Sequence, residues 1–493
     1  MTELIHDIDV VDVRGDPAST PVSSVEFDSR HAAAGSLFCC VPGAHTDGHL
    51  YAPEAVSRGA TSLLCERFLD LDVTQVRVGA GQVRPAMACV SASFYGHPAR
   101  SMTMVGVTGT NGKTTVTHLI RSILNHDGQS AATIGTLDGE RTTPEAPVLQ
   151  RLLAGFRADG RKAVAMEVSS HALTQHRVDG MVFDVAAFTN LSRDHLDHHG
   201  TMEEYFRAKA RLFEASRARA VVVNVDDPWG RRLAREIEGE GRSVVAVRRS
   251  DASDVVLSVG SSSFRWRGHA VTIPLSGTFN VDNALLAATV AVSLGHNVDR
   301  VADGLGAAHP VPGRMEVISK GQPFSVVVDY AHTPAGLDVA LSSARDLADG
   351  HRVICVFGGG GDRDQGKRPQ MGAAAARWSD VVVLTSDNPR SEDPLAIIEQ
   401  VRAGIGHQVQ LVVEPDRALA IQVAVDLAQP GDVVLVAGKG HETTQSLADR
   451  VVDFDDRVEA ERALAQRTGS AATGSAATGD AGSGDAGSGD AAR

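Results

Sequence analysis

The residue types best suited to chemistry lie in one short run, at residues 109–115. The run consists of Gly109, Thr110, Asn111, Gly112, Lys113, Thr114 and Thr115. Glycines let backbone N–H groups turn toward an anion, a lysine reaches the terminal phosphates of a nucleotide, and a threonine hydroxyl ligates Mg²⁺. The usual spacing of such a loop is not met in full, because Val107 stands where its first glycine would be. The run still predicts a loop that binds a nucleoside triphosphate.

Two further groups of metal-binding residue types follow along the chain. Glu167 stands in the string Met-Glu-Val-Ser-Ser-His, and His195 stands in Asn-Leu-Ser-Arg-Asp-His-Leu-Asp-His-His. Each string follows an apolar run, at residues 163–168 and 185–188, that predicts a buried strand. Because the carboxyl ends of parallel strands meet at one edge of a sheet, we expect Glu167 and His195 to converge on ions held by Thr114. Two such ions would neutralise charge during phosphoryl transfer.

The elements that must position these residues predict an α/β protein of three domains with a tail. Short apolar runs and Ala-rich stretches over residues 1–98 predict a small N-terminal α/β domain. Residues 99–313 alternate continuous β-rich runs with helical patterns, which predicts a central P-loop-type domain with a parallel sheet. The same pattern restarts over residues 314–466 and predicts a Rossmann-like C-terminal domain. Residues 467–493 are rich in Gly, Ala, Ser and Asp, so we expect them to be disordered.

Composition excludes several classes of partner. The chain has 493 residues and a net charge of -14, which leaves no basic footprint for nucleic acid or an anionic membrane. No stretch reaches the ~18 apolar residues of a membrane span, and residues 1–13 lack the basic region of a signal peptide. The five cysteines show no C-x-x-C spacing, which is typical of reduced thiols. We therefore expect a cytoplasmic protein that binds small charged molecules, with no nucleic acid and no membrane insertion.

Taken together, these strings resemble the Mur ligases of bacterial cell-wall synthesis. The strings that extend the resemblance are Gly277-Thr-Phe-Asn280-Val-Asp-Asn283, Gly313-Arg314-Met-Glu, Asp329-Tyr-Ala-His332, Gly361-Asp-Arg363-Asp and Gly438-Lys-Gly-His-Glu442. They follow one another through all three predicted domains, so the ordered set is far more specific than the phosphate loop alone. The resemblance is strongest to the branch of the family that adds the third residue of the peptide stem.

The resemblance implies an ATP-dependent amide ligase of peptidoglycan precursor synthesis. In this family a substrate carboxylate attacks the γ-phosphate of ATP, and an incoming amine converts the resulting acyl phosphate to an amide. In this branch the acid is UDP-N-acetylmuramoyl-L-alanyl-D-glutamate and the amine is meso-diaminopimelate. The resemblance therefore implies a need for ATP and two Mg²⁺ ions, and we expect a monomer.

The resemblance also gives roles to residues by position. It assigns Lys113 to the β- and γ-phosphates. It assigns Thr114 and Glu167 to one Mg²⁺ and His195 to the second. Lys209 matches a lysine that the family carries as a carbamate, which supports the second ion; an unmodified ammonium would repel Mg²⁺. Without the family, Lys209 would be interpreted as a lysine on a helix surface. The remaining nucleotide contacts implied are Asn280, Asn283, Arg314 and Asp329.

Two substrate sites follow from the same resemblance. The sugar nucleotide would be held by Ser29, Ala44, His45, Thr46, Thr142, Thr143, Ser169, Gln175 and Arg177. The amino acid would be held by Arg363, Asp387, Asn388, Pro389, Arg390, Gly438 and Glu442. Arg390 could bind a carboxylate bidentately, and meso-diaminopimelate carries a distal carboxylate that lysine lacks.

The sequence leaves alternatives to this function open. The same ligase could use L-lysine, which the presence of Arg390 disfavours. A nucleotide-binding protein without ligase activity would be expected to lack Lys113, Glu167, His195 or Lys209, and all four are present. A simple P-loop hydrolase or kinase would not need the strings of the third domain.

Overall fold

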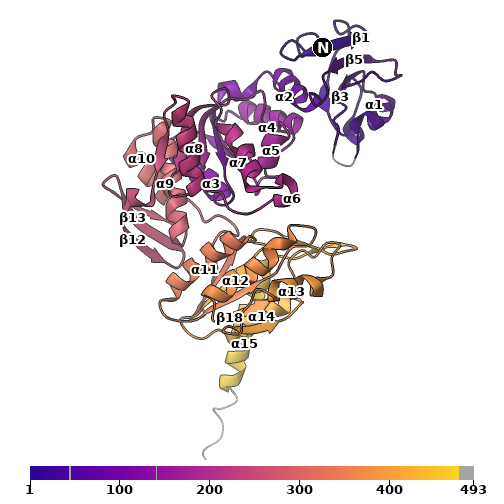
Figure 1. Ribbon diagram of the computed structural model, residues 1–493. Coiled ribbons are helices and arrows are strands. Elements are labelled where there is room, and N and C mark those ends of the chain that lie inside the picture. The colour runs from indigo at the N-terminus through magenta and orange to yellow at the C-terminus, as the bar shows by residue number, and fades with distance from the viewer. Residues whose placement is uncertain (44–45, 140, 477–493) are drawn as a thin grey trace, which may run out of the picture. The chain divides into compact units, whose positions relative to one another are not determined.

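The computed structural model describes residues 1–43, 46–139 and 141–476, with side chains described as far as Arg467. The chain divides into two compact units, Met1–Val311 and Pro312–Arg493 (Figure 1). The first unit contains two separate sheets with parallel strands and the second contains one. The three-domain α/β fold is thus confirmed, while the domain limits stay predictions.

The N-terminal domain is a five-stranded sheet with strand order β1-β5-β4-β3-β2. β1 pairs antiparallel to β5, and the other neighbours are parallel. Apolar side chains of the strands pack against α2 on one face, where Val83 and Met87 are buried. The elements are β1 (Val10–Arg14), β2 (Ser24–Glu26), β3 (Ser36–Cys39), α1 (Ala52–Ser57), β4 (Ser62–Cys65), β5 (Thr74–Val78) and α2 (Val83–Phe94).

The central domain is built on a six-stranded sheet with order β11-β10-β9-β6-β8-β7, in which every pairing is parallel. The strands are β6 (Thr103–Thr108), β7 (Ala131–Ile134), β8 (Ala163–Glu167), β9 (Phe183–Phe188), β10 (Ala218–Asn224) and β11 (Val245–Val247). Because β6 lies between β8 and β9, the three loops that leave these strands start side by side at one sheet edge. The helices are α3 (Lys113–His126), α4 (Ala146–Ala158), α5 (Ser170–Thr174), α6 (Leu196–His199), α7 (Met202–Ala210), α8 (Pro228–Gly239), α9 (Thr278–Ser293) and α10 (Val298–Gly306).

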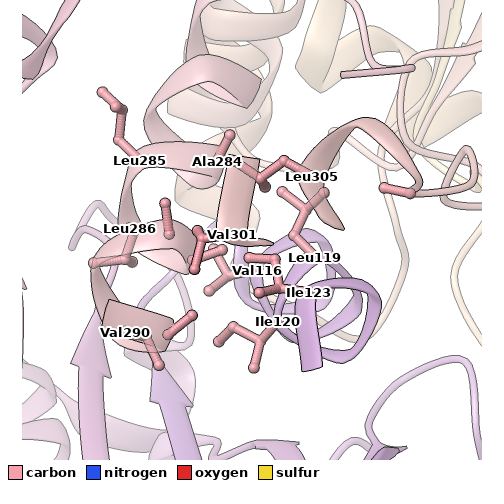
Figure 2. Close-up of a cluster of buried hydrophobic side chains, with 14 of the residues drawn as sticks. Val116, Leu119, Ile120, Ile123, Ala284, Leu285, Leu286, Val290, Val301 and Leu305 are labelled. Carbon is pink, nitrogen blue, oxygen red and sulfur yellow. The ribbon is translucent and has the colours of Figure 1, made fainter. Parts of the chain in front are cut away.

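Helix α3 follows the phosphate loop and packs tightly against α9 and α10. Its buried residues Val116, Leu119, Ile120 and Ile123 recur at the spacing of one helical face. Figure 2 shows them meeting side chains from α9 and α10, and all of them belong to one buried apolar cluster. This packing fixes the start of α3 beside the start of α9.

A three-stranded antiparallel sheet in the central domain was not predicted from the sequence. It has the order β12-β13-β14 and consists of β12 (Ala252–Ser258), β13 (Ser261–Trp266) and β14 (His269–Ile273). Phe264 and Trp266 anchor it in the same apolar cluster as α9. The prediction missed it because β12 is mostly exposed and carries no continuous apolar run.

The C-terminal unit holds a six-stranded sheet with order β15-β16-β20-β17-β18-β19. Only β15 is antiparallel to its neighbour. A two-stranded hairpin, β21 with β22, follows β20. The strands are β15 (Glu316–Ile318), β16 (Ser325–Asp329), β17 (Val353–Phe357), β18 (Val381–Leu384), β19 (Gln410–Val413), β20 (Val433–Ala437), β21 (Thr444–Ser446) and β22 (Val451–Asp453). The helices are α11 (Pro334–Ala348), α12 (Arg368–Trp378), α13 (Pro394–Arg402), α14 (Arg417–Leu427) and α15 (Asp456–Ala476).

The prediction of a disordered tail from residue 467 is wrong for its first ten residues, because α15 continues to Ala476. Figure 1 shows its last turns projecting beyond the rest of the C-terminal unit. The helix is anchored by Ala460, Ala463 and Leu464 in the core, so its last turns extend a helix that is already nucleated. Residues 477–493 lie outside the described part of the chain.

Among the described helices, none is both long and apolar enough to cross a membrane.

Candidate active site

The phosphate loop joins β6 to α3, as predicted, and its glycines are needed for its path. Gly109 and Gly112 have φ angles of 147° and 86°, a region that favours glycine. A Cβ atom at Gly109 would clash with the side chain of Thr189. The Thr189 hydroxyl instead donates a 2.6 Å hydrogen bond to the Asn111 carbonyl, which ties the loop to the end of β9.

Thr114 and Glu167 come together at this sheet edge. The Thr114 hydroxyl donates to Glu167 Oε1 over 2.9 Å, and both side chains are buried. Glu167 Oε1 also accepts the backbone N–H of Thr136 at 2.8 Å. Gly135 leaves the room for this carboxylate, since a Cβ atom there would clash with Oε1. Two oxygen donors of the kind that Mg²⁺ prefers therefore lie in contact at the foot of the phosphate loop.

His195 lies in a group of histidines on the loop after β9. Its ring packs edge-on against His171, with 5.0 Å between the ring centres, and His171 stacks on His198 at 4.1 Å. Burial, and then the charge that neighbouring histidines would carry, lowers the pKa of His171 to about 4. Desolvation lowers the pKa of His195 to about 4 as well. Both rings are therefore neutral near pH 7, the state in which imidazole ligates a metal.

Lys209 is buried, in contrast to the surface position that its sequence context alone would suggest. Only 1 % of the residue is exposed, and its Nζ donates to the Gly109 carbonyl at 2.8 Å. The Nζ of Lys113 donates to the same carbonyl oxygen at 3.0 Å. Burial, and then the Lys113 ammonium, lowers the pKa of Lys209 well below its ordinary value. A neutral amine next to the phosphate loop is the form that reacts with CO₂.

Asn280 and Asn283 lie in the first turns of α9, beside the phosphate loop. The Asn283 amide donates to Asn280 Oδ1 at 3.1 Å, and a Cβ atom on Gly112 would clash with Asn283. Thr115 is buried in the first turn of α3, and Thr110 accepts the N–H of Ser192. The structure thus groups the predicted nucleotide contacts of the first unit around one loop.

Five of the predicted sugar-nucleotide contacts gather near Glu167. Thr143 links three of them: its hydroxyl donates to the Glu167 carbonyl at 2.9 Å, and its carbonyl accepts from Arg177 at 2.8 Å. The five residues are Thr142, Thr143, Ser169, Gln175 and Arg177, joined by hydrogen bonds among themselves and through Thr136.

The remaining sugar-nucleotide predictions lie in the N-terminal domain. The Ser29 hydroxyl donates to Glu54 at 2.8 Å, and the Thr46 carbonyl accepts from Gly43. Ala44 and His45 lie outside the described residues. Among the described residues, no hydrogen bond joins Ser29 or Thr46 to the Thr143 group, so their common role stays a prediction.

The C-terminal unit brings the predicted amino-acid contacts together where three loops leave β17, β18 and β20. Asn388, after β18, donates from Nδ2 to Glu442 Oε2 at 2.8 Å. Gly361, after β17, donates its N–H to the Asn388 carbonyl at 2.9 Å. Gly438, after β20, has a φ of 118°, and a Cβ atom there would approach Asp387 to 2.5 Å. These contacts hold the loops that follow β17, β18 and β20 against one another.

Arg390 is held in an unusual backbone conformation by these loops. Its φ is 50°, and its N–H donates to the Ser446 carbonyl at 3.0 Å. Its guanidinium donates to the Gly361 carbonyl at 2.6 Å. Pro389 is buried in the same loop, whereas Arg363 is exposed and bonds only to the neighbouring Asp362 carbonyl among the hydrogen bonds of the described side chains.

Arg314 and Asp329 lie near each other in the second unit. The buried Asp329 carboxylate accepts the N–H groups of Met315 and Ala331, each at 2.8 Å. Arg314 lies over the ring of Tyr330, 4.3 Å from its centre. Burial raises the pKa of Asp329, and the Arg314 charge opposes this effect. The contact of Arg314 and Asp329 with the nucleotide stays a prediction.

Comparisons with known proteins agree with this geometry. Family models match residues 21–93 as the Mur ligase family, catalytic domain, residues 107–291 as the Mur ligase middle domain, and residues 313–440 as the Mur ligase, glutamate ligase domain. The UDP-N-acetylmuramoyl-L-alanyl-D-glutamate--2,6-diaminopimelate ligase of Geobacillus kaustophilus is 44% identical over 466 residues, which cover 90% of this chain and 95% of that protein. The chain belongs to the Mur ligase family. It is accordingly an ATP-dependent ligase.

Solved Mur ligases share the fold. A structure of UDP-N-acetylmuramoyl-L-alanyl-D-glutamate--2,6-diaminopimelate ligase is 32% identical and covers 94% of this Mur ligase and 98% of that chain, with a TM-score of 0.65. The MurF ligase of Thermotoga maritima, solved in complex with ADP, is 21% identical, covers 92% of this chain and all of that one, and has a TM-score of 0.64. At that identity the second match supports the fold alone.

Sequence reasoning missed several charged residues that organise the site of this Mur ligase. Glu145 is 5% exposed and pairs with Arg84, Arg141 and Arg177. Lys439 is fully buried beside Asn388 and Glu442. Lys439 stands inside a string quoted for the family, and Glu145 follows the predicted contacts Thr142 and Thr143, but a single sequence carries no sign that a charged side chain is buried.

Proposed function

We propose that this Mur ligase joins meso-diaminopimelate to UDP-N-acetylmuramoyl-L-alanyl-D-glutamate at the expense of ATP. The observation that carries the proposal is that Arg390 and Glu442 are held on neighbouring loops at the carboxyl ends of β18 and β20 in the C-terminal unit. A guanidinium and a carboxylate suit the distal carboxylate and ammonium of this amino acid. Relatives at 40–45% identity that bear the name of this ligase support the same reaction.

The reaction uses the two substrates in order. A carboxylate oxygen of the D-glutamyl residue attacks the γ-phosphorus of ATP, and ADP leaves, giving an acyl phosphate. The amine of diaminopimelate then attacks the acyl carbon, inorganic phosphate leaves, and the amine loses a proton as the amide forms. Lys113 and the backbone N–H groups of the phosphate loop stabilise the negative charge of the transferred phosphoryl group.

The residues of the first unit fit two Mg²⁺ ions. Thr114 and Glu167 would hold one, and His195 with a carbamate on Lys209 would hold the other. The donor set fits, because two oxygen groups lie in contact, the pKa of His195 is lowered to about 4, and burial lowers the pKa of Lys209. When bound, the ions supply charge neutralisation for the phosphoryl group.

The carbamate on Lys209 has its own test. Removing dissolved CO₂ should lower turnover, and added bicarbonate should restore it. Lys209→Ala should reduce turnover to a small residual rate that does not respond to bicarbonate. Turnover of the unaltered enzyme that ignores CO₂ would remove the carbamate from the proposal and leave the ligase function intact.

The decisive experiment follows phosphate release from ATP with the sugar-nucleotide acid and either meso-diaminopimelate or L-lysine, with the product identified by mass. We expect amide with meso-diaminopimelate, and a preference over lysine of ~10²-fold or more that Arg390→Ala removes. Arg402→Ala, an exposed arginine of the same unit, is the control. Equal use of lysine would overturn the role of Arg390, and no amide with either amine would overturn the function.

Size and location complete the proposal. We expect a monomer in the cytoplasm, where UDP-linked precursors are made. Sedimentation of the purified protein at working concentration checks the first expectation, and fractionation of cells checks the second.

A further inference from the structure

Lys439 is a buried lysine that lies among the predicted amino-acid contacts, beside Asn388 and Glu442. None of its surface is exposed, and its Nζ donates to three acceptors: the Thr444 carbonyl at 2.7 Å, Glu442 Oε2 at 3.0 Å and Asn388 Oδ1 at 3.2 Å. An ammonium has three protons, so all of its donors are in use. Lys439 therefore acts on its neighbours and has no donor left for a substrate.

The first neighbour that Lys439 fixes is the Asn388 amide. Two donors converge on one terminal atom of this side chain: the Lys439 ammonium, and the N–H of Ser446 at 2.9 Å. An atom that faces two donors must be the oxygen, so the amide has one allowed orientation. Its Nδ2 then points to Glu442 Oε2, 2.8 Å away.

Glu442 is the second neighbour that Lys439 fixes. Oε2 accepts from both Lys439 and Asn388, whereas Oε1 accepts none of the hydrogen bonds found among the described residues. The Glu442 side chain is 31% exposed, so one oxygen is bound inside and the carboxylate still reaches solvent. Lys439 thus selects which edge of the carboxylate is presented to a ligand.

We propose that Lys439 is a positioning residue for recognition of the distal ammonium of the incoming amino acid, by holding Asn388 and Glu442 in one arrangement. The inference rests on the proposed function. Arg390 serves the distal carboxylate, and the set held by Lys439 serves the amino group on the same carbon. Loss of Lys439 would remove one of the two donors to Asn388 Oδ1 and one of the two donors to Glu442 Oε2, so both side chains would be held less firmly in that arrangement.

The test compares meso-diaminopimelate with 2-aminopimelate, which keeps the distal carboxylate and lacks the distal amino group. The unaltered enzyme should prefer meso-diaminopimelate in kcat/KM. Lys439→Met should shrink that preference ~10-fold or more, with the KM for ATP and for the sugar nucleotide unchanged. A residue that only stabilised the fold would lower kcat/KM for both amines by the same factor.

Arg352→Met is the matched control. Arg352 pairs with the buried Asp432 at 2.6 Å, where β17 and β20 begin, at the opposite edge of the same sheet. It should lower the melting temperature and leave the amine preference unchanged. Lys439→Gln, which keeps one donor, should show an intermediate preference.

Each outcome decides. An unchanged preference in Lys439→Met, or a failure of both Lys439 variants to fold, would assign this lysine to stability alone and overturn the inference. If the unaltered enzyme does not use meso-diaminopimelate, the proposed function is overturned instead. The activity of the unaltered enzyme is therefore measured before any variant is compared.

Discussion

At the scale of single residues, two lysine side chains lie close together at the phosphate loop of this Mur ligase. Lys113 and Lys209 share one carbonyl oxygen, that of Gly109. Two ammonium groups so close would repel each other, and only Lys209 is fully buried, so burial and the neighbouring charge both lower the pKa of Lys209. The buried position thus favours the neutral amine more than surface exposure would.

Gly135 tests how tightly Glu167 must be placed. Gly135→Ala should lower kcat by ~10²-fold, because the added methyl group displaces the Glu167 carboxylate by a fraction of its own width. Gly139→Ala is the control, since a Cβ atom there has no neighbour within 4 Å. Steady-state kinetics at saturating ATP measure both, and equal rates for the two variants would refute the requirement.

His171 gives a prediction about pH. Its pKa is about 4 in the folded chain and 6.5 in the ordinary, unfolded state. Between these values the unfolded chain holds the additional proton, so acidification favours unfolding. His171→Asn should therefore flatten the fall in unfolding free energy from pH 6.5 to pH 4, by at most ~1.4 kcal/mol per pH unit. Urea titrations across this range measure the slope, and identical slopes would contradict the assignment.

At the scale of elements, charge pairs join helices that belong to different domains. Glu145 caps the start of α4, and among its partners Arg84 comes from α2 of the N-terminal domain. Glu145→Gln should lower the free energy of unfolding by ~3 kcal/mol, because three guanidinium groups lose a buried counter-charge. Glu203→Gln is the matched control.

The control also carries a carboxylate paired with two arginines, Arg207 and Arg232, but it is half exposed. Its loss should cost under ~1 kcal/mol. Denaturant unfolding measures both variants, and similar losses would show that the Glu145 cluster is no more than a surface network.

The sequence predicts the elements to different degrees for physical reasons. The parallel strand β8 is buried on both faces and leaves a continuous apolar run, so the run predicted at residues 163–168 matches Ala163–Glu167 within one residue. β12 is mostly exposed and mixes polar with apolar residues, and it was missed. The candidate site was assembled from polar strings at strand ends. The burial of Lys439 and Glu145 was not predicted, because their partners lie on other elements.

At the scale of the whole molecule, the residues predicted for the nucleotide and those predicted for the amino acid lie in different units. The phosphate loop and Glu167 belong to the first unit, and Arg390 and Glu442 belong to the second. The boundary lies between Val311 and Pro312.

The C-terminal end of the chain gives a prediction at this scale. Ending the chain after Arg467 should keep full turnover and melting temperature, since the core contacts of α15 are all retained. Ending it after Asp455 should prevent folding, because Arg417 would lose Asp456, its fully buried partner at 2.7 Å. Melting curves and phosphate release compare the two, and loss of ligation in the longer form would give residues 468–493 an active part.

The left-handed backbone conformation of Arg390 lowers the stability of the fold at a residue proposed to select the amino acid. An arginine pays ~1 kcal/mol or more to adopt a φ of 50°, whereas glycine adopts it freely. A laboratory search for heat-resistant variants alone would therefore be expected to exchange Arg390 for glycine. On the role proposed for Arg390, the survivors would melt later and lose their preference for meso-diaminopimelate over lysine.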